Sequence, residues 1–242
     1  MPVYVVTGAN RGLGLEFVRQ LSESKENIIV ACTRSELSDL GDLKLSNKHS
    51  NIHLRGCDTG SIESIEAFAS SASKLLDGQK IDYLINNAGI NSVPEETSLS
   101  ISAAGLEEQI RVNVLGPAKV TEILLSAGLL SQNVVVVNMT SGLGSMVNSV
   151  SITPRKCTTY SISKAALNML TVHQGSELRE IGGLKGAIVI CMDPGWVKTR
   201  MGGEGAVLEP HESIEGMLKC VHGLKAEDAG KFYTYTGEEV PW

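Results

Sequence analysis

The start of the chain constrains the fold more than any other stretch. Residues 3–6 are apolar and mostly β-branched, which predicts a short buried strand. The run Thr7-Gly8-Ala9-Asn10-Arg11-Gly12-Leu13-Gly14 follows at once, and a helical pattern of apolar residues then continues to Leu21. A strand, a glycine-rich turn and a helix form the unit that binds a pyrophosphate, because glycines let the backbone approach the phosphates and the helix N-terminus supplies free N–H groups. The spacing is Gly-x-x-x-Gly-x-Gly rather than Gly-x-Gly-x-x-Gly, and a tight turn without a ligand is the alternative interpretation.

Strand-like and helix-like segments alternate along the rest of the chain. Further strands are predicted at residues 27–33, 53–58, 80–85, 133–139, 186–192 and 231–236, and further helices at residues 61–76, 106–130, 160–180 and 212–224. We expect Pro117 to kink the helix over residues 106–130. This alternation predicts an α/β fold, with a Rossmann-type, doubly wound, mainly parallel sheet of seven strands and helices on both faces. At 242 residues without a linker or repeat, one domain is expected, with residues 1–140 binding a cofactor and residues 141–242 carrying catalysis and the substrate loops.

The residue after the second predicted strand bears on which dinucleotide is bound. Arg34 stands there, 20 residues after Gly14. An acidic residue at this place would hold the ribose 2′-OH of NAD, whereas an arginine would accommodate the 2′-phosphate of NADP. Arg11 lies within the glycine-rich run, and Glu36 is a competing acidic candidate two residues later. The two arginines favour NADP(H).

Polar and small residues follow several other predicted strands. Asp58 and Thr59 follow the third, Asn86-Asn87-Ala88-Gly89 the fourth, Ser141 the fifth and Pro194-Gly195 the sixth. Ligands bind outside the carboxyl ends of parallel strands, so these residues are candidates for one site. Simpler structural roles remain open for two of them: the carboxylate could cap the helix that follows, and the serine could belong to a turn.

Tyr160 and Lys164 lie four residues apart on a predicted helix and so share one of its faces. A phenol has an ordinary pKa of about 10, and a nearby ammonium lowers it, which makes the pair a workable general acid–base. A solvent-exposed pair without function is the alternative. Asn113 is an amide among apolar neighbours, and it could equally satisfy a broken backbone hydrogen bond.

Composition excludes several classes of protein. The net charge is −6 and no basic stripe is present, so neither nucleic acid nor an anionic membrane is an expected partner. No apolar run approaches the length of a membrane span, and the N-terminus enters a strand-like segment without the pattern of a signal peptide. The five cysteines are scattered without a Cys-x-x-Cys pair, which predicts reduced thiols, no metal site and a cytoplasmic location.

Taken together and in this order, the motifs resemble the short-chain dehydrogenase/reductase family over nearly the whole chain. The runs 8–16, 138–145 and 194–199 are most similar to the Sniffer-type and C-factor-like carbonyl reductases of that family. The resemblance implies NADPH-dependent reduction of a ketone or aldehyde to an alcohol. Tyr160 would donate the proton to the carbonyl oxygen, and Ser141 would bind that oxygen. Lys164 would hold the nicotinamide ribose and lower the pKa of Tyr160, and Asn113 would hold a water linking Lys164 to solvent.

The resemblance also implies cofactor contacts and partners. The implied contacts are Thr7, Gly8, Asn10, Arg11, Gly12, Leu13, Gly14, Arg34, Asp58, Thr59, Asn87, Ala88, Gly89, Tyr160, Lys164, Pro194, Gly195, Val197 and Thr199. The partner would be a small carbonyl substrate, held between segments 90–97, 143–158 and 196–208. Independently of the resemblance, residues 200–211 are glycine-rich, which suits a mobile lid over a pocket. Family members occur as monomers, dimers and tetramers, often paired through helices corresponding to residues 106–130 and 160–180, so a homodimer or homotetramer is one implied state.

Two residues depart from the pattern or stand near it. Asp193 precedes Pro194-Gly195 where the most similar relatives carry histidine, and we expect its carboxylate to be solvated rather than to affect substrate choice. Cys157, three residues before Tyr160, is expected to be an ordinary loop thiol rather than part of the pocket mouth. Two other functions stay open: a biosynthetic reductase with a specialised substrate, and a nucleotide-binding sensor without turnover. The intact set of Ser141, Tyr160 and Lys164 counts against the sensor.

Overall fold

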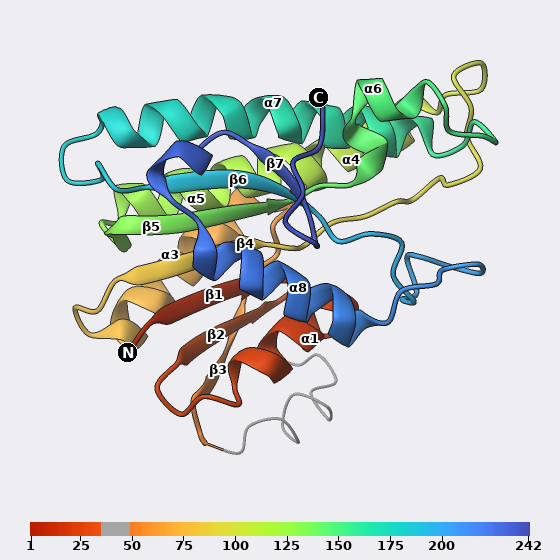
Figure 1. The fold of residues 1–242 in the computed structure, drawn as a ribbon. Helices are drawn as coiled ribbons and strands as arrows, with labels where there is room; N and C mark the ends of the chain where they lie inside the picture. Colours follow the sequence, from red (N-terminus) through yellow and green to blue (C-terminus); the bar gives the residue numbers. More distant parts are fainter. Residues whose placement is uncertain (35–48) are drawn as a thin grey trace.

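A parallel sheet of seven strands runs through the centre of the molecule (Figure 1). The computed structural model describes residues 1–34 and 49–242. The strand order is β3-β2-β1-β4-β5-β6-β7, and every neighbouring pair is parallel. The strands are β1 Val3–Thr7, β2 Ile28–Thr33, β3 Ile52–Gly56, β4 Ile81–Asn86, β5 Leu130–Met139, β6 Ile188–Asp193 and β7 Phe232–Thr234. The predicted fold class is confirmed, and the sheet is wholly rather than mainly parallel.

Helices cover both faces of the sheet. In the described residues they are α1 Gly12–Leu21, α3 Ile62–Leu76, α4 Ala103–Ile110, α5 Gly116–Ser126, the short α6 Met146–Ser149, α7 Thr158–Glu180 and α8 Pro210–Gly223. Figure 1 shows α1 and α8 on one face and α3, α4, α5 and α7 on the other. No helix within residues 1–34 and 49–242 is long and apolar enough to cross a membrane.

Each face of the sheet has its own hydrophobic core, because successive side chains of a strand point to opposite faces. Val5, Val136 and Val189 pack on the face of α3 and α5, whereas the next residues along β1 and β5, Val6 and Val137, pack on the face of α1 and α8. Strands buried on both faces read as continuous apolar runs, which is why the central strands could be predicted from sequence.

The long helix predicted over residues 106–130 is wrong in two respects. The structure divides it into α4, the π-helical turn η1 Arg111–Leu115 and α5, and the last helical residue is Ser126 because β5 already begins at Leu130. Pro117 does not kink a continuous helix. It lies in the first turn of α5, where its missing N–H costs little. Single π-helical turns are frequent at functional sites, and this one carries the buried Asn113.

Candidate active site

The glycine-rich turn folds tightly against the end of β4. Gly8 and Gly12 have φ values of +66° and +54°, which favour glycine. A Cβ on Gly14 would lie 2.2 Å from the Gly8 carbonyl oxygen. The Asn87 side-chain amide donates to the carbonyl of Thr7 at 2.8 Å, and the Ala88 N–H donates to the Thr7 hydroxyl at 3.0 Å. These contacts require glycine where the sequence has it.

The turn presents the N-terminus of α1 to solvent. Arg11 is the N-cap residue in an extended conformation, and no side chain caps the helix. Asn10, Arg11 and Gly12 are exposed, and Leu13 is half-buried. An uncapped helix N-terminus has free N–H groups and the positive end of the helix dipole, both of which suit a phosphate. The residues present therefore fit the pyrophosphate of a dinucleotide.

The candidates for the adenosine end lie at neighbouring strand ends. Arg34 is exposed directly after β2, and within the described ranges neither it nor Arg11 forms an ion pair. Asp58 and the buried Thr59 follow β3, which pairs with β2. Asp58 does not cap the next helix, since Ser61 does so, but its carboxylate accepts from the N–H of Gly60 at 2.9 Å. The competing candidate Glu36 lies outside the described residues.

The four predicted catalytic residues come together at the carboxyl ends of β4 and β5. The Tyr160 hydroxyl lies near enough to the Ser141 side chain for Ser141 to act on the pKa of the phenol. The Lys164 Nζ lies 5.5 Å from the centre of the Tyr160 ring and donates to the carbonyl of Met139 at 2.6 Å. A Cβ on Gly89 would lie 3.3 Å from the Asn113 Oδ1 and 3.6 Å from the Lys164 Nζ, so these two side chains meet beside the glycine.

Asn113 links the π-helical turn to two other segments. Its Oδ1 accepts from the N–H of Ile90 at 2.8 Å, and its Nδ2 donates to the carbonyl of Ile90 at 2.9 Å and to the Ser163 hydroxyl at 3.0 Å. The amide thus satisfies backbone groups, as the simpler interpretation of the sequence expects. It also fixes the segment after β4 against α7, so the placement suits both interpretations.

A second buried set of polar residues supports the turn that carries Ser141. The Thr140 hydroxyl donates to the Asn168 Oδ1 at 2.6 Å, and the Asn168 Nδ2 donates to the carbonyl of Gly144 at 3.1 Å. Sequence reasoning missed this support. Its only signal was polar residues on the buried face of the helix that carries Tyr160 and Lys164, and polar residues on a helix are usually solvated.

The electrostatics differ from the expectation for Tyr160. Burial raises the pKa of its phenol, and the nearby charge of Asp193 raises that pKa further, while the Ser141 side chain lowers it. The predicted lowering of the Tyr160 pKa by Lys164 is therefore wrong for this structure. Lys164 is directed to the Met139 carbonyl, and burial lowers its own pKa to about 8.

Asp193 is not solvated as expected. It is half-buried at the end of β6, where its Oδ1 accepts from the N–H of Gly195 at 3.1 Å. Its Oδ2 lies 3.1 Å from the position of a Cβ on Gly142, the residue after Ser141. Burial raises the pKa of the Asp193 carboxyl, although the N–H groups of Gly195 and Gly142 oppose the shift. The carboxylate therefore lies beside the catalytic candidates.

The segment after β6 returns to the glycine-rich turn. The Pro194 carbonyl accepts from the Ser213 hydroxyl at 2.7 Å, and Gly195 has a φ of +77°. Val197 is buried and forms an isolated bridge with Leu208. A Cβ on Gly12 would lie 3.6 Å from the Thr199 Cγ2. The predicted nicotinamide and phosphate candidates are thus adjacent in space.

The predicted lid is a folded loop with internal contacts. The Trp196 Nε1 donates to the carbonyl of Gly202 at 2.8 Å, and the N–H of Lys198 donates to the carbonyl of Leu208 at 2.9 Å. The half-buried Cys157 is the N-cap residue of α7 with a φ of +57°. Its thiol donates to the carbonyl of Pro94 at 3.3 Å. Cys157 therefore tethers the loop after β4 rather than standing free.

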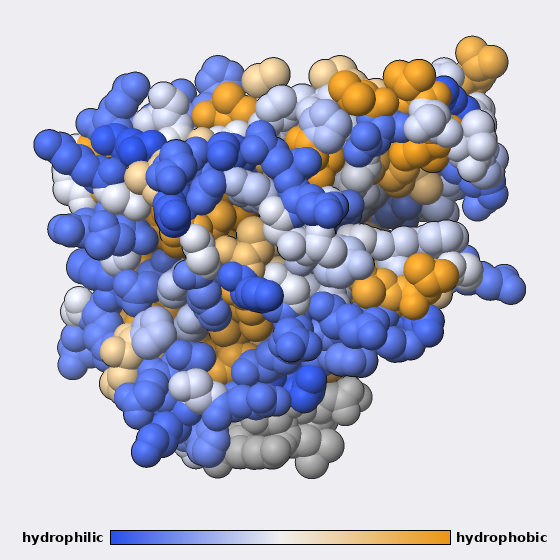
Figure 2. All heavy atoms as spheres, viewed as in Figure 1, coloured by the Kyte–Doolittle hydropathy of each residue, from blue (hydrophilic) through white to orange (hydrophobic). Residues whose placement is uncertain are grey.

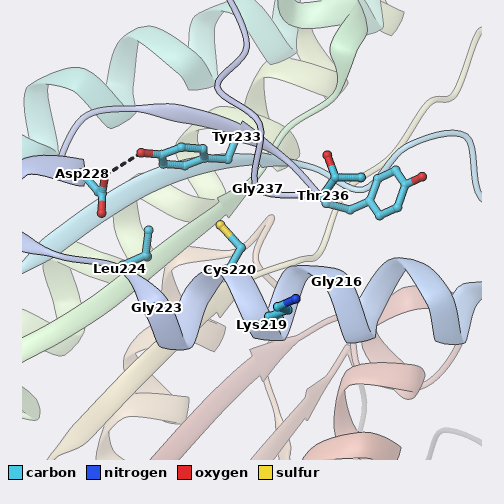
Figure 3. A pocket seen from close by; sticks show the side chains of 10 residues that line it. Gly216, Lys219, Cys220, Gly223, Leu224, Asp228, Tyr233, Thr236 and Gly237 are labelled. Atoms are coloured by element: carbon cyan, nitrogen blue, oxygen red, sulfur yellow. Dashed lines mark hydrogen bonds between the residues drawn. The ribbon is translucent and has the colours of Figure 1, made fainter.

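A separate cavity of about 520 Å³ lies between α8 and the chain around β7 (Figure 3). Cys220 and Lys219 line it from the helix, and Tyr233 and Asp228 line the other side, joined by a hydrogen bond of 2.6 Å. None of the predicted site residues lines this cavity.

The lowered pKa of Lys164 predicts a pH dependence of stability. Because the unfolded chain holds the proton up to about pH 10.5 and the folded chain only up to about pH 8, the unfolded state binds more protons between these values. The folded state is therefore penalised in full below pH 8, and the penalty disappears as pH rises to 10.5. Urea unfolding of Lys164→Met and wild type should show a difference in unfolding free energy that changes by about 3 kcal/mol, in favour of wild type, over this range. A difference that does not vary with pH would contradict the assignment.

Comparison with known proteins places these features in a family. The family model described as short chain dehydrogenase matches residues 2–206. The C-signal protein of Myxococcus xanthus is 36% identical over 165 residues, covering 67% of this chain and 93% of that protein. A dehydrogenase of Rhodococcus, named for 1-hydroxy-2-glutathionyl-2-methyl-3-butene, is 30% identical over the full length of both chains.

Solved structures agree with the sequence comparison. The NADPH-bound carbonyl reductase from chicken fatty liver superposes with a TM-score of 0.89 at 31% identity, and the carbonyl reductase Sniffer of D. melanogaster with 0.87 at 25%. In both cases all of each chain is covered. The chain therefore belongs to the short-chain dehydrogenase/reductase family of oxidoreductases.

Proposed function

We propose that this protein is an NADPH-dependent carbonyl reductase that converts a ketone or aldehyde to an alcohol. The observation that carries the proposal is the meeting of Tyr160, Ser141 and Lys164 beside a glycine-rich turn shaped for a dinucleotide. The NADPH-bound avian carbonyl reductase of the same fold supports both the cofactor and the reaction. Reduction is favoured over oxidation because cells keep the NADP pool mostly reduced.

The chain's own residues would divide the work as follows. Bound NADPH supplies the hydride that reaches the carbonyl carbon. The Ser141 and Tyr160 hydroxyls hold the carbonyl oxygen, and Tyr160 gives its proton to that oxygen as the alcohol forms. Lys164 holds the ribose next to the nicotinamide, and Asn113 steadies the turn behind it. Thr199, Val197 and the turn at Gly195 would position the nicotinamide amide.

The raised pKa of Tyr160 suits this direction. A phenol whose pKa lies above its ordinary value is fully protonated at pH 7, so the proton is present when the carbonyl oxygen needs it. Lys164, whose pKa is about 8, is close enough to neutral pH to return a proton to the site between turnovers. The two groups therefore have matched roles as donor and relay.

Arg34 and Arg11 support NADPH over NADH. Arg34→Ala should weaken NADPH binding about tenfold or more, because a charge-assisted contact with the 2′-phosphate contributes roughly 1.5–3 kcal/mol. NADH binding should change little, since NADH lacks that phosphate. Fluorescence titration of both cofactors measures this, with the exposed and distant Arg179→Ala as the matched control. An equal loss of affinity for NADPH and NADH would refute the 2′-phosphate assignment.

Two further expectations have structural support. Ile162, Met169 and Val172 are exposed apolar residues on α7, and they suit the homodimer or homotetramer implied by the resemblance. All five cysteines are free thiols, which suits a cytoplasmic location.

A further inference from the structure

Asp193 is a charged group that the proposed reaction does not use. Its carboxylate lies at the carboxyl end of β6, against Gly142 and next to the Ser141 that would bind the carbonyl oxygen. It is close enough to Tyr160 for its charge to act on the phenol. A carboxylate in this place acts on any charge carried by a substrate, because the interaction between charges is strong in a half-buried site.

The protein does not neutralise this carboxylate. The ion pairs among residues 1–34 and 49–242 form elsewhere, and none of them includes Asp193. The Lys164 ammonium is directed to the Met139 carbonyl instead. The other groups that act on the pKa values of Asp193 and Tyr160 are the uncharged side chains of Ser141 and Cys157 and the backbone N–H groups of Gly142 and Gly195. A partly buried charge without a cationic partner is costly to the fold, so a functional role is the more economical explanation.

A purely structural role would not require the charge. The Oδ1 of Asp193 accepts the N–H of Gly195 and so closes the turn after β6. An asparagine has an oxygen in the same position and could accept the same hydrogen bond. Asp193→Asn therefore keeps the hydrogen bond that closes the turn and removes only the negative charge.

Exposed apolar side chains flank the region of the site. Met146, Val147 and Val150 are exposed on and beside α6, and Trp196 and Met201 are exposed on the loop that faces this segment. Figure 2 shows apolar side chains over the α6 segment and on the loop below it, on either side of a hollow at the right of the view. A substrate would therefore meet apolar walls and one negative charge near the reacting carbonyl.

We propose that Asp193 is a specificity-determining residue that makes the site select cationic carbonyl compounds with an apolar body and reject anionic ones. The inference rests on the proposed carbonyl reductase function and adds the charge of the preferred substrate. It also gives Asp193 a role that the turn alone does not explain.

The test uses two matched pairs of benzaldehydes with the substituent in the meta position. Trimethylammonio and tert-butyl groups have the same shape but differ by one positive charge, and carboxylate and carboxamide groups differ by one negative charge. Initial rates of NADPH consumption give kcat/KM for each aldehyde with wild type, Asp193→Asn and the control Glu180→Gln. The control removes one negative charge at the far end of α7.

For wild type, we expect kcat/KM for the cation to exceed that for its neutral partner, and kcat/KM for the anion to fall below that of its neutral partner. We divide kcat/KM for each charged aldehyde by kcat/KM for its neutral partner. The ratio obtained for the cation should exceed the ratio obtained for the anion at least tenfold. Asp193→Asn should reduce this factor to less than threefold, and Glu180→Gln should leave it as in wild type. A structural role would lower kcat/KM for all four aldehydes by the same factor.

Three results would overturn the inference. Turnover with the same charge preference in wild type and Asp193→Asn, or with no preference in wild type, would refute the role of Asp193 and leave the reductase function intact. No turnover of any aldehyde by wild type would overturn the proposed function and this inference together.

Discussion

Tyr160→Phe should lower kcat/KM for carbonyl reduction by a factor of about 10² to 10⁴ and leave NADPH binding within about twofold of wild type. The substitution removes one hydroxyl, which is the proposed proton donor and lies near Ser141. The ring and its place beside Lys164 remain, so the cofactor site keeps its shape. Loss of NADPH absorbance with a panel of diketones, quinones and aldehydes measures turnover, and fluorescence titration measures binding.

Tyr83→Phe is the matched control for this experiment. Tyr83 stacks on Tyr4 with ring centroids 4.5 Å apart, and it belongs to the core on the α1 and α8 face rather than to the site. Its loss of a hydroxyl should leave turnover unchanged. If Tyr160→Phe retained full turnover, another group would have to donate the proton. If wild type bound NADPH but reduced none of the panel, the nucleotide-sensor interpretation would gain support.

Gly14→Ala should abolish NADPH binding at micromolar concentrations and destabilise the fold. The new Cβ would lie 2.2 Å from the Gly8 carbonyl oxygen and 2.6 Å from the Asn87 Nδ2, so either the turn or the end of β4 must move. Overpacking of this kind typically costs 1–3 kcal/mol, and for a chain of this length the melting temperature should fall by roughly 5–10 °C. Thermal unfolding and NADPH titration measure the two effects.

A second glycine provides the control for Gly14→Ala. Gly182 follows α7, and a Cβ there would meet no atom within 4 Å. Gly182→Ala should therefore leave both NADPH affinity and melting temperature close to wild type. A Gly14→Ala protein with unchanged affinity would mean that the turn can shift without loss, and that close packing of these glycines does not define the site.

Much of the fold could be predicted because its signals are local. The apolar runs of β1, β2 and β5 and the glycine-rich turn are each contained in fewer than a dozen residues. The boundary between α5 and β5 could not be predicted in the same way. Leu129 and Leu130 continue the helical pattern of apolar residues, but tertiary pairing of Leu130 with Ile81 places it in the sheet. The π-helical turn could not be predicted either, because so short a segment shows no distinct periodicity of apolar residues.

In the candidate site, too, the features set by local sequence could be predicted, and those set by tertiary packing could not. The spacing of Tyr160 and Lys164 predicted their shared face, because four residues make one helical turn. The direction of the Tyr160 pKa could not be predicted from that spacing. It depends on burial and on Asp193, which is 33 residues away along the chain and reaches the phenol only when β6 and α7 pack together. The prediction that Asp193 is solvated was wrong for the same reason, because its burial depends on tertiary packing.

The hydrogen bonds between Asn87 and the turn after β1 also determine when, during synthesis and folding, the candidate site can be completed. They join residues 80 positions apart, and β1 pairs with β4 only after two intervening strands have been made. A nascent chain in which Asn87 has not yet been synthesised therefore lacks the hydrogen bonds that hold the glycine-rich turn, even if β1 and α1 have formed. A ligand that binds only the folded state raises the free energy of unfolding by RT ln(1 + [L]/Kd). A nucleotide that binds the completed site would by this relation raise the yield of native protein when it is present during synthesis.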